Sequence, residues 1–387
     1  MSLTERERAI VALLRADPLL DAAGLAERLG STRAAVSVHL SNLTRKGVLL
    51  GRGYLVRPDA GSVLVVGGAV LDLKVRTSTP PVLATSNPGT ATSAVGGVGR
   101  NIAENLARLG TPTALVAAVG RDAAADTVLG RTSEAGVDCR HVILSPHPTG
   151  TYTALLDHVG DLHLAVADMR ATDELTVGDL AVVPSLLAGA GALIVDCNLH
   201  VDVIRWLLTT AAAAGVPAVL EPVSVAKATE AAPALDGSVP LHTVTPNVDE
   251  LAALVGAPVA DAVDDVVRAA GVLHARGVER VWVRRGTRGS LLSVDAGVDG
   301  DGAARRVVLV AAPAVEVADV TGAGDAMTAG YVHAVLRGEG VVEAARTGQV
   351  LAALTCASPD TVRPDLTAAL VAAHLTPTHP ATEETSR

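Results

Sequence analysis

The chain has 387 residues, of which 49% are hydrophobic, and it carries a net charge of −10 at pH 7. This length and composition favour a globular protein with a large core over a disordered chain. No apolar stretch is long enough to cross a bilayer, and the N-terminal segment Thr4–Arg8 is too charged for a signal peptide. Cys139, Cys197 and Cys356 show no paired spacing, which fits a reducing compartment. Together these features lead us to expect a cytoplasmic protein without a membrane partner.

Charge is distributed unevenly along the chain. Residues 1–57 contain nine Lys or Arg against five Asp or Glu, whereas the rest of the chain contains 22 against 36. A basic segment ahead of an acidic one is expected when a small nucleic-acid-binding module is fused to a domain with a different role.

Residues 1–57 have the pattern of a winged helix-turn-helix domain. Thr4 and Glu7 have the spacing of a capping box, and the apolar residues that follow recur at helical intervals. We predict three helices, a pair of short strands around a turn, and a linker, at 4–17, 22–29, 33–46, 47–56 and 58–61.

Basic and polar side chains of the third helix and of the wing are the predicted DNA contacts. Arg33 and Ser37 face outward on the recognition helix, whereas Arg45, Lys46 and Arg52 are placed for phosphates. A basic helix face is often only solvated, so a module without a nucleic-acid partner is one alternative. The other is a transcription regulator whose second domain only senses a metabolite.

From Ser62 onward, short β-branched runs alternate with alanine-rich helical stretches. This rhythm predicts an α/β domain over 62–375 with a mostly parallel sheet covered by helices. The predicted strands are 63–66, 114–119, 192–195, 218–220 and 281–283. Two stretches, 72–94 and 149–166, break the rhythm, and we expect them to form the extra strands of a small β lid. Residues 376–387 are polar and are expected to be a frayed tail.

A glycine-rich turn late in the chain is the strongest candidate for chemistry. We predict a strand over 315–320, then the turn Thr321–Gly324, and then a helix from Asp325 through Val335. Glycines let backbone amides approach an anion closely, and the helix N-terminus adds partial positive charge, so the turn suits a phosphoryl group. Asp325 is placed to accept the proton of an attacking hydroxyl. A simple helix cap is the alternative at this point.

Two familiar nucleotide sites are excluded. The chain has no G-x-x-x-x-G-K-[ST] segment, and Gly322-Ala-Gly324 is followed by Met327 where a dinucleotide fingerprint requires Gly or Ala. The segment Asp319-Val-Thr-Gly-Ala-Gly-Asp325 instead resembles the C-terminal signature of the ribokinase-like (PfkB-type) carbohydrate kinases. Gly96-Gly-Val-Gly-Arg-Asn101 resembles the N-terminal motif of the same family, and the similarity spans about residues 62–370.

The resemblance implies phosphoryl transfer from ATP with Mg²⁺. In that case Gly322, Ala323 and Gly324 form an anion hole beside the catalytic base Asp325. The other implied ligands are Asp319 and Thr321 for a monovalent cation such as K⁺, Asn247 and Glu250 for Mg²⁺ and phosphates through water, and Gly286, Gly289 and Lys227 for ATP. Without the resemblance, Asn247 and Glu250 have the pattern of a helix cap, and a surface lysine is the alternative for Lys227.

The resemblance also implies a sugar site. Asp72 is expected to accept hydrogen bonds from two vicinal hydroxyls, Gly96 and Gly97 to offer bare backbone, and Asn101 to add an amide. Asp168, which follows the second lid stretch, is a candidate for contact with a nucleobase. A solvated loop carboxylate is the alternative for Asp168.

The details of the motifs favour one branch of the family. Ribokinases have Gly-Gly-Lys-Gly-Ala-Asn where this chain has Gly-Gly-Val-Gly-Arg-Asn. Residues 87–89 and 221–227, together with the winged helix, look most like the pseudouridine-kinase branch. We therefore expect phosphorylation of the 5′-hydroxyl of a C-nucleoside, and the alternative is another family kinase that acts on ribose, fructose or a nucleoside. Members of this family often pair through lid strands, which makes a homodimer an expectation here.

Overall fold

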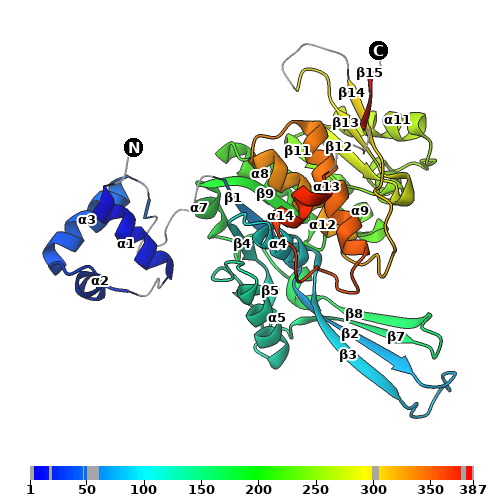
Figure 1. Ribbon diagram of the computed structural model, residues 1–387, viewed down its shortest axis with the longest axis horizontal. Coiled ribbons are helices and arrows are strands. Elements are labelled where there is room, and N and C mark those ends of the chain that lie inside the picture. Colours follow the sequence, from blue (N-terminus) through cyan, green and yellow to red (C-terminus); the bar gives the residue numbers. More distant parts are fainter. Residues whose placement is uncertain are drawn as a thin grey trace.

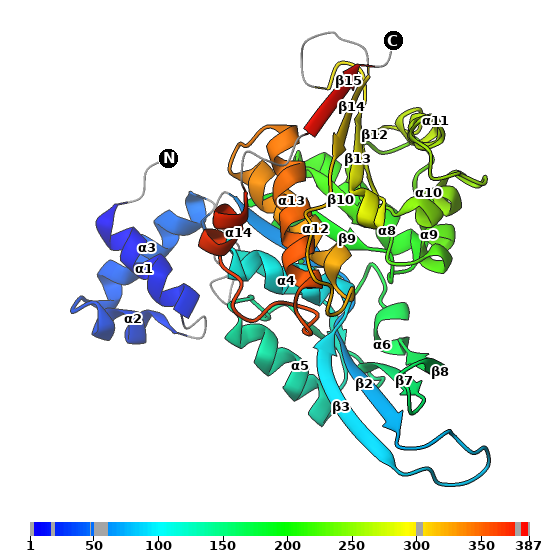
Figure 2. The same cartoon turned by 45° about the vertical axis from the view of Figure 1, so that its right-hand side comes forward.

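The computed structural model describes residues 4–16, 20–46, 48–49, 61–298, 305–375 and 381–385. The described chain forms a small helical N-terminal domain and a large α/β domain, from which a narrow second sheet projects (Figures 1 and 2). Within these ranges, no helix is both long enough and apolar enough to cross a membrane.

The N-terminal domain contains the three predicted helices, α1 (Glu5–Ala16), α2 (Ala22–Arg28) and α3 (Arg33–Arg45). The capping box is confirmed, since the amide of Thr4 donates to Glu7 Oε2 over 2.7 Å and the amide of Glu7 donates to Thr4 Oγ1 over 3.2 Å. The helices enclose a small apolar core built from Ile10, Leu14, Leu25, Val36, Leu40 and Leu43. Most of the predicted wing and most of the linker lie outside the described residues, but Leu49 at the start of the wing is described and belongs to this apolar core.

The main sheet has nine strands in the order β15-β14-β13-β12-β11-β10-β9-β1-β4. The strands are β1 (Ser62–Val66), β4 (Thr113–Val116), β9 (Ala190–Asp196), β10 (Ala218–Glu221), β11 (Leu241–Val244), β12 (Val278–Arg284), β13 (Ser290–Val294), β14 (Arg306–Val310) and β15 (Ala381–Thr385). The pairs from β4 to β12 are parallel, and β13, β14 and β15 are added antiparallel. The predicted mostly parallel sheet is therefore confirmed.

Helices cover both faces of this sheet, which is why its central strands are almost continuously apolar. One face packs against α4 (Val98–Arg108), α5 (Ala123–Glu134), α12 (Ala323–Leu336), α13 (Val341–Cys356) and α14 (Ala368–His374). The other face packs against α7 (Val183–Leu187), α8 (Val201–Ala214), α9 (Val225–Ala231), α10 (Val248–Val255) and α11 (Val263–His274). Two separate apolar cores result, one on each side of the sheet.

The two stretches that break the rhythm do form a separate sheet. Its four strands lie in the order β3-β2-β7-β8, with β2 (Val70–Thr77), β3 (Gly89–Gly96), β7 (Gly150–Leu156) and β8 (Leu162–Asp168). This lid sheet projects from the α/β domain beside α5 (Figure 2). The short helix α6 (Arg170–Asp173) follows β8, and β5 (Ala118–Val119) pairs with β6 (Ile143–Leu144).

Two expectations are corrected by the structure. The segment 315–320 is not a strand, because Val315, Val317 and Val320 are exposed to solvent and the amide of Ala318 donates to the carbonyl of Cys356 over 2.8 Å instead. The tail is not wholly frayed, because residues 381–385 form β15 against β14. An edge strand offers unpaired backbone groups, so a segment can pair with it without an apolar pattern.

Candidate active site

The glycine-rich turn leads directly into α12. Gly322 has a φ of +79°, and a Cβ at this position would overlap the carbonyl of Thr361. A Cβ at Gly324 would overlap the guanidinium of Arg284. Gly322 thus requires glycine, and a side chain at Gly324 would displace Arg284, so the two glycines leave the backbone amides at the N-terminus of α12 open to an anion at close range.

Asp325 lies in the first turn of α12 and is 8% exposed. Asn101 of α4 donates from Nδ2 to Asp325 Oδ2 over 2.8 Å. Burial raises the pKa of Asp325 to about 8, and the negative charge of Glu221 adds to the shift, whereas Asn101 and Arg284 oppose it. A carboxyl group with a pKa near neutrality is suited to accept and release a proton.

A buried ion network beside Asp325 was not predicted from the sequence. Arg284, at the end of β12, donates from Nη2 to Glu221 over 2.7 Å and to Glu250 over 3.0 Å. Glu221, at the end of β10, also accepts hydrogen bonds from Thr245 and Thr328 over 2.7 and 2.8 Å. In the sequence, Glu221 follows the strand predicted at 218–220, and Arg284 follows the strand predicted at 281–283. Ligands of α/β proteins bind at the carboxyl ends of parallel strands, so these two positions were the only signal in the sequence.

Asn247 and Glu250 form a complete capping box at the start of α10. Asn247 Oδ1 accepts from the amide of Glu250, and Glu250 Oε2 accepts from the amide of Asn247, each over 2.8 Å. Burial raises the pKa of Glu250, while Arg284 opposes the shift. The structural interpretation of this motif is thus correct, and both side chains also line the cavity described below.

The proposed sugar side of the site is built from β2, β3 and α4. Asp72 lies on β2, and a Cβ at Gly96 would overlap its carboxylate. Gly97 has a φ of +98° and packs against the carbonyl of Gly68. Burial raises the pKa of Asp72 to about 6, whereas the charges of Lys74 and Arg100 oppose the shift.

Asp196 is a second buried carboxylate, and no sequence motif predicted its role. It ends β9, and its Oδ2 accepts from the amides of Gly68 and Gly99, each over 2.8 Å. Burial raises the pKa of Asp196, and these backbone hydrogen bonds oppose the shift. The carboxylate therefore ties the turn after β1 to the first turn of α4, which holds the Gly-Gly motif in place.

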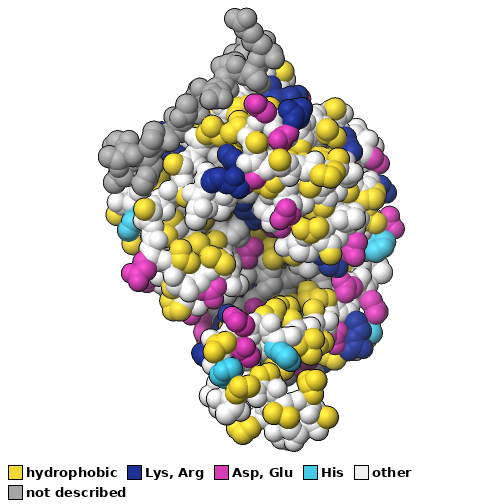
Figure 3. All heavy atoms as spheres, turned by 90° about the vertical axis from the view of Figure 1, so that its right-hand side faces the viewer, with side chains coloured by type: hydrophobic (Ala, Val, Ile, Leu, Met, Phe, Trp, Pro, Cys, Tyr) yellow, Lys and Arg dark blue, Asp and Glu magenta, His cyan; other side chains and the backbone are white. Residues whose placement is uncertain are grey.

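These elements line a cavity of about 490 Å³ that opens to solvent. Its walls include Asp72, Gly97, Asn101, Gly322, Gly324 and Asp325 from the two motifs. Figure 3 shows the surface hollowed between the α/β domain and the lid sheet, with acidic side chains near the rim. Segments more than 200 residues apart in sequence meet here, since 224 residues separate Asn101 from Asp325.

The turn after β12 approaches the same cavity. Gly286 lines the cavity, whereas Gly289 has a φ of +80° and packs against the carbonyl of Val310. Arg285 Nε binds Asp261 over 2.6 Å, and Arg288 binds the same carboxylate. Gly286 is thus placed for a ligand, while Gly289 has a structural role.

A family model described as pfkB family carbohydrate kinase matches residues 60–368. The chain belongs to this family. A second model, described as winged helix-turn-helix DNA-binding, matches residues 3–49 of the kinase chain.

Individual relatives agree with the family. This kinase is 32% identical to the uncharacterized sugar kinase YeiI of Escherichia coli, with 95% of this chain and 97% of that protein covered. It is 32% identical to the pseudouridine kinase of Escherichia coli, with 80% and 95% covered. The structure resembles a carbohydrate kinase from Agrobacterium tumefaciens with a TM-score of 0.71 at 31% identity, covering 84% of this chain and 99% of that chain. The ribokinase-like fold and the carbohydrate kinase class are thereby confirmed.

Asp168 and Lys227 are among the predicted site residues that do not line the cavity of this kinase. Asp168 is bound by Arg170 over 2.6 Å, and Lys227 is bound by Asp173 over 3.3 Å. Neither Asp168 nor Lys227 is among the described residues that line the cavity. The ion pairs with residues of α6 occupy both charged groups, which sequence spacing does not reveal.

The predicted monovalent-cation ligands of the kinase lie together. Asp319 Oδ1 accepts from the amide and the hydroxyl of Thr321 over 2.8 and 2.7 Å. The other oxygen of Asp319 faces the ammonium of Lys74 on the lid strand β2, at 3.5 Å.

The predicted DNA contacts of the kinase chain fall into three groups. Arg33, Ser37 and Arg45 are exposed on α3. Lys46 is instead bound to the buried Glu7 over 2.7 Å, so its ammonium holds α3 to α1. Arg52 lies outside the described residues.

Proposed function

We propose that this kinase transfers the γ-phosphoryl group of ATP to a primary hydroxyl of a sugar or nucleoside, with pseudouridine as the favoured substrate. The observation that carries the proposal is the buried carboxyl of Asp325 beside the glycine turn, in the same cavity as Asp72. A hydroxyl held by Asp72 and a phosphoryl group held at the N-terminus of α12 share one open cavity, which brings the two groups together as in-line transfer requires.

The proposed reaction divides its tasks among groups of this chain. Asp325 accepts the hydroxyl proton as the new oxygen–phosphorus bond forms and the bond between the β- and γ-phosphates breaks, and ADP leaves. The amides of Gly322, Ala323 and Gly324 hold the oxygens of the transferring group. Arg284 adds a fixed positive charge beside Gly324, which suits the charge that develops there.

Mg²⁺ is implied by the family, and the residues present fit it. No cluster of three or more His, Cys, Asp or Glu side chains forms a direct metal site in the described part of the chain. The amide oxygen of Asn247 and the carboxylate of Glu250 line the cavity, and oxygen groups of this kind suit Mg²⁺ that is held through water. When bound, Mg²⁺ neutralises charge on the phosphates. Asp319 and Thr321 are the proposed ligands for K⁺.

A nucleoside substrate is favoured by the lid. Asp72 and Tyr152 are direct partners in the parallel pair of β2 and β7, so their side chains lie on the same face of the lid sheet. Tyr152 is 40% exposed and is not among the described residues that line the cavity, but its ring lies on the same lid face as Asp72 and is suited to stack on a base that extends from the sugar along the lid. The similarity to a pseudouridine kinase supports the same substrate.

A substrate panel tests this function. With ATP and Mg²⁺, we expect a higher kcat/KM for pseudouridine than for ribose, fructose or adenosine. Tyr152→Ala should raise the KM for pseudouridine and leave that for ribose unchanged. Far faster turnover of ribose, fructose or adenosine would overturn the substrate, and Asp325→Ala with full activity would overturn the mechanism. We expect Asp325→Ala to lose about 10²- to 10⁴-fold in kcat.

DNA binding is the second proposed function, and the match of residues 3–49 to a winged helix-turn-helix model supports it. Arg33 and Arg45 are exposed on α3, where they are available to phosphates. We expect salt-dependent retention of a DNA fragment from upstream of the coding sequence, which is lost in Arg33→Ala/Arg45→Ala. The matched control is Arg121→Ala in the kinase domain, and equal retention by all three proteins would refute DNA binding. Light scattering of the purified chain tests the expected homodimer.

A further inference from the structure

Arg100 is a buried cation in the first turn of α4, and the reaction outlined above gives it no task. Its side chain is 3% exposed. A guanidinium in such a place must have its charge compensated and its N–H groups bonded, or it would destabilise the fold. The partners of Arg100 therefore indicate what the residue does.

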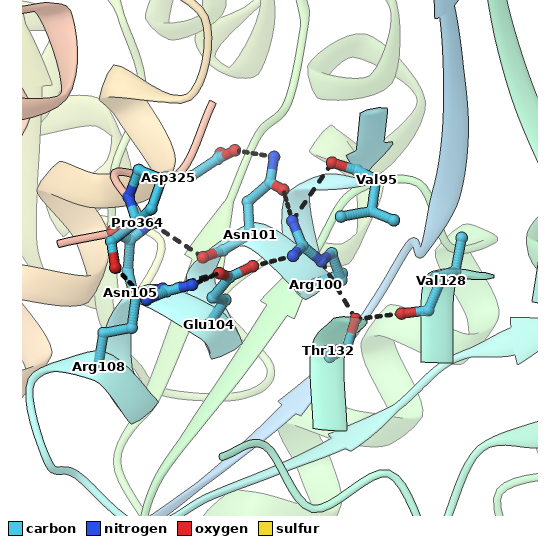
Figure 4. A network of polar contacts seen from close by, with 10 residues as sticks. All are labelled: Val95, Arg100, Asn101, Glu104, Asn105, Arg108, Val128, Thr132, Asp325 and Pro364. Atoms are coloured by element: carbon cyan, nitrogen blue, oxygen red, sulfur yellow. Dashed lines mark hydrogen bonds and ion pairs between the residues drawn. The ribbon is translucent and has the colours of Figure 1, made fainter. Parts of the chain in front are cut away.

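The guanidinium of Arg100 is held from three elements at once (Figure 4). Its Nε donates to Thr132 of α5 over 3.2 Å, and its Nη2 pairs with Glu104 of α4. Its Nη1 donates to the carbonyl of Val95 at 3.3 Å and to the side-chain oxygen of Asn101 at 3.0 Å. The last of these contacts leads into the active site.

Asn101 connects Arg100 to Asp325. Its amide group has an oxygen that only accepts and a nitrogen that only donates, so the group can be reversed. A guanidinium carries donors alone, which means that only the oxygen of Asn101 can face Arg100. The nitrogen is then directed at Asp325, to which it donates over 2.8 Å (Figure 4).

We propose that Arg100 is a positioning residue that holds the amide of Asn101 in the orientation that donates a hydrogen bond to Asp325. This inference rests on the proposed role of Asp325 as the base. A donor favours the ionised carboxylate, which is the form that accepts a proton from the substrate. If the Asn101 amide were reversed, its oxygen would face Asp325. Only the protonated carboxyl of Asp325 could then donate a hydrogen bond to that oxygen.

The other charged groups around Asp325 make this orientation matter. Glu221 at the end of β10 and Asp196 at the end of β9 both favour the protonated form, and Arg284 at the end of β12 opposes them. The ionised base therefore depends on Arg284 and on the hydrogen bond from Asn101. Arg100 also acts on Asp72 through its positive charge, an effect that belongs to substrate binding rather than to the base.

The test is the pH dependence of kcat/KM for Arg100→Met. We expect the limb that reports the base to move to higher pH by about one unit, as expected for the loss of one hydrogen bond to a charged group. Arg100→Lys keeps a group with donors only and should keep the limb where it is. Thr132→Val is the structural control, because it removes a different partner of Arg100 and should lower the melting temperature without moving the limb.

A double-mutant cycle separates positioning from a general effect of charge. In the Asn101→Ala background, adding Arg100→Met should not move the limb further, although the KM for the sugar substrate can still rise through Asp72. Additive shifts in the double variant, or an unmoved limb in Arg100→Met, would overturn the proposal. If Arg100→Met does not fold, Arg100→Leu takes its place, because leucine also offers no donor to the Asn101 amide.

Failure of this proposal is distinguishable from failure of the proposed function. An active Asp325→Asn enzyme would remove the base itself. An inactive Asp325→Asn enzyme combined with an unmoved limb in Arg100→Met, or in Arg100→Leu where it replaces that variant, would remove only the positioning role.

Discussion

Asp325→Asn is expected to lower turnover strongly and at the same time to stabilise the kinase domain at neutral pH. The carboxyl of Asp325 has a pKa raised to about 8 from an ordinary 3.8, chiefly by burial. At pH 7 the folded protein must therefore hold a proton that the unfolded chain releases. Asparagine keeps the shape and can still accept from Asn101, but it has no charge to bury.

The size of this effect follows from the pKa. About three pH units separate the ordinary pKa from pH 7, which sets an upper value of about 4 kcal/mol on the gain in the free energy of unfolding. Relaxation around the charge reduces this value, so we expect a gain of about 1–3 kcal/mol. In the wild type, the loss in the free energy of unfolding caused by Asp325 begins above a pH of about 4. It grows until a pH of about 8, where Asp325 is ionised in the folded protein as well. Below pH 4 the two proteins should be equally stable.

Urea unfolding followed by tryptophan fluorescence from pH 4 to pH 8 measures this difference. The chain has two tryptophans, Trp206 and Trp282, and both lie in the kinase domain, so the signal does not report on the N-terminal domain. The matched control is Asp319→Asn. Burial favours a higher pKa for Asp319, but hydrogen bonds from Thr321 and the charge of Lys74 hold its pKa below the usual value.

The control variant should therefore gain no stability at neutral pH. The reasoning about Asp325 would be refuted by a gain in Asp325→Asn that is the same at pH 4 and pH 7, or by a loss of stability at pH 7. A loss of activity without any gain in stability would leave Asp325 in the mechanism but would contradict the buried, proton-binding carboxyl.

Three further predictions follow from the same site. In the wild type, kcat/KM should rise with pH and level off near a pH of about 8 as Asp325 loses its proton; a profile that falls between pH 6 and 8 would contradict a carboxylate base. Gly322→Ala should lower both the melting temperature and kcat, because the new Cβ meets the carbonyl of Thr361, whereas Gly338→Ala, with a similar φ of +78° and open space, should lower only the melting temperature. Lys227→Ala and Asp168→Asn should change kcat/KM for pseudouridine less than about threefold, since neither side chain lines the cavity. A tenfold loss in steady-state assays would contradict this prediction and would show that these side chains enter the cavity when substrate binds.

The sequence alone was sufficient for the parts of the molecule that are encoded locally. A capping box, the alternation of strands and helices, and the two glycine motifs each depend on residues within about one turn or strand of each other. These patterns predicted the α/β sheet, the lid strands and the helix after Gly324. The strand predicted at 315–320 was wrong because valines favour strands only where a sheet is available to pair with them and bury their side chains.

The electrostatics of the site were decided only by the tertiary structure. Arg284 meets Glu221 and Glu250 because β10 and β12 end, and α10 begins, at the same edge of the sheet. No local sequence pattern encodes this order of the strands. Asn101 reaches Asp325 because α4 and α12 pack side by side on one face. A carboxyl group becomes a base near neutrality through burial and through charges brought from distant segments, so its position in the chain is readable from sequence, whereas its pKa is a property of the fold.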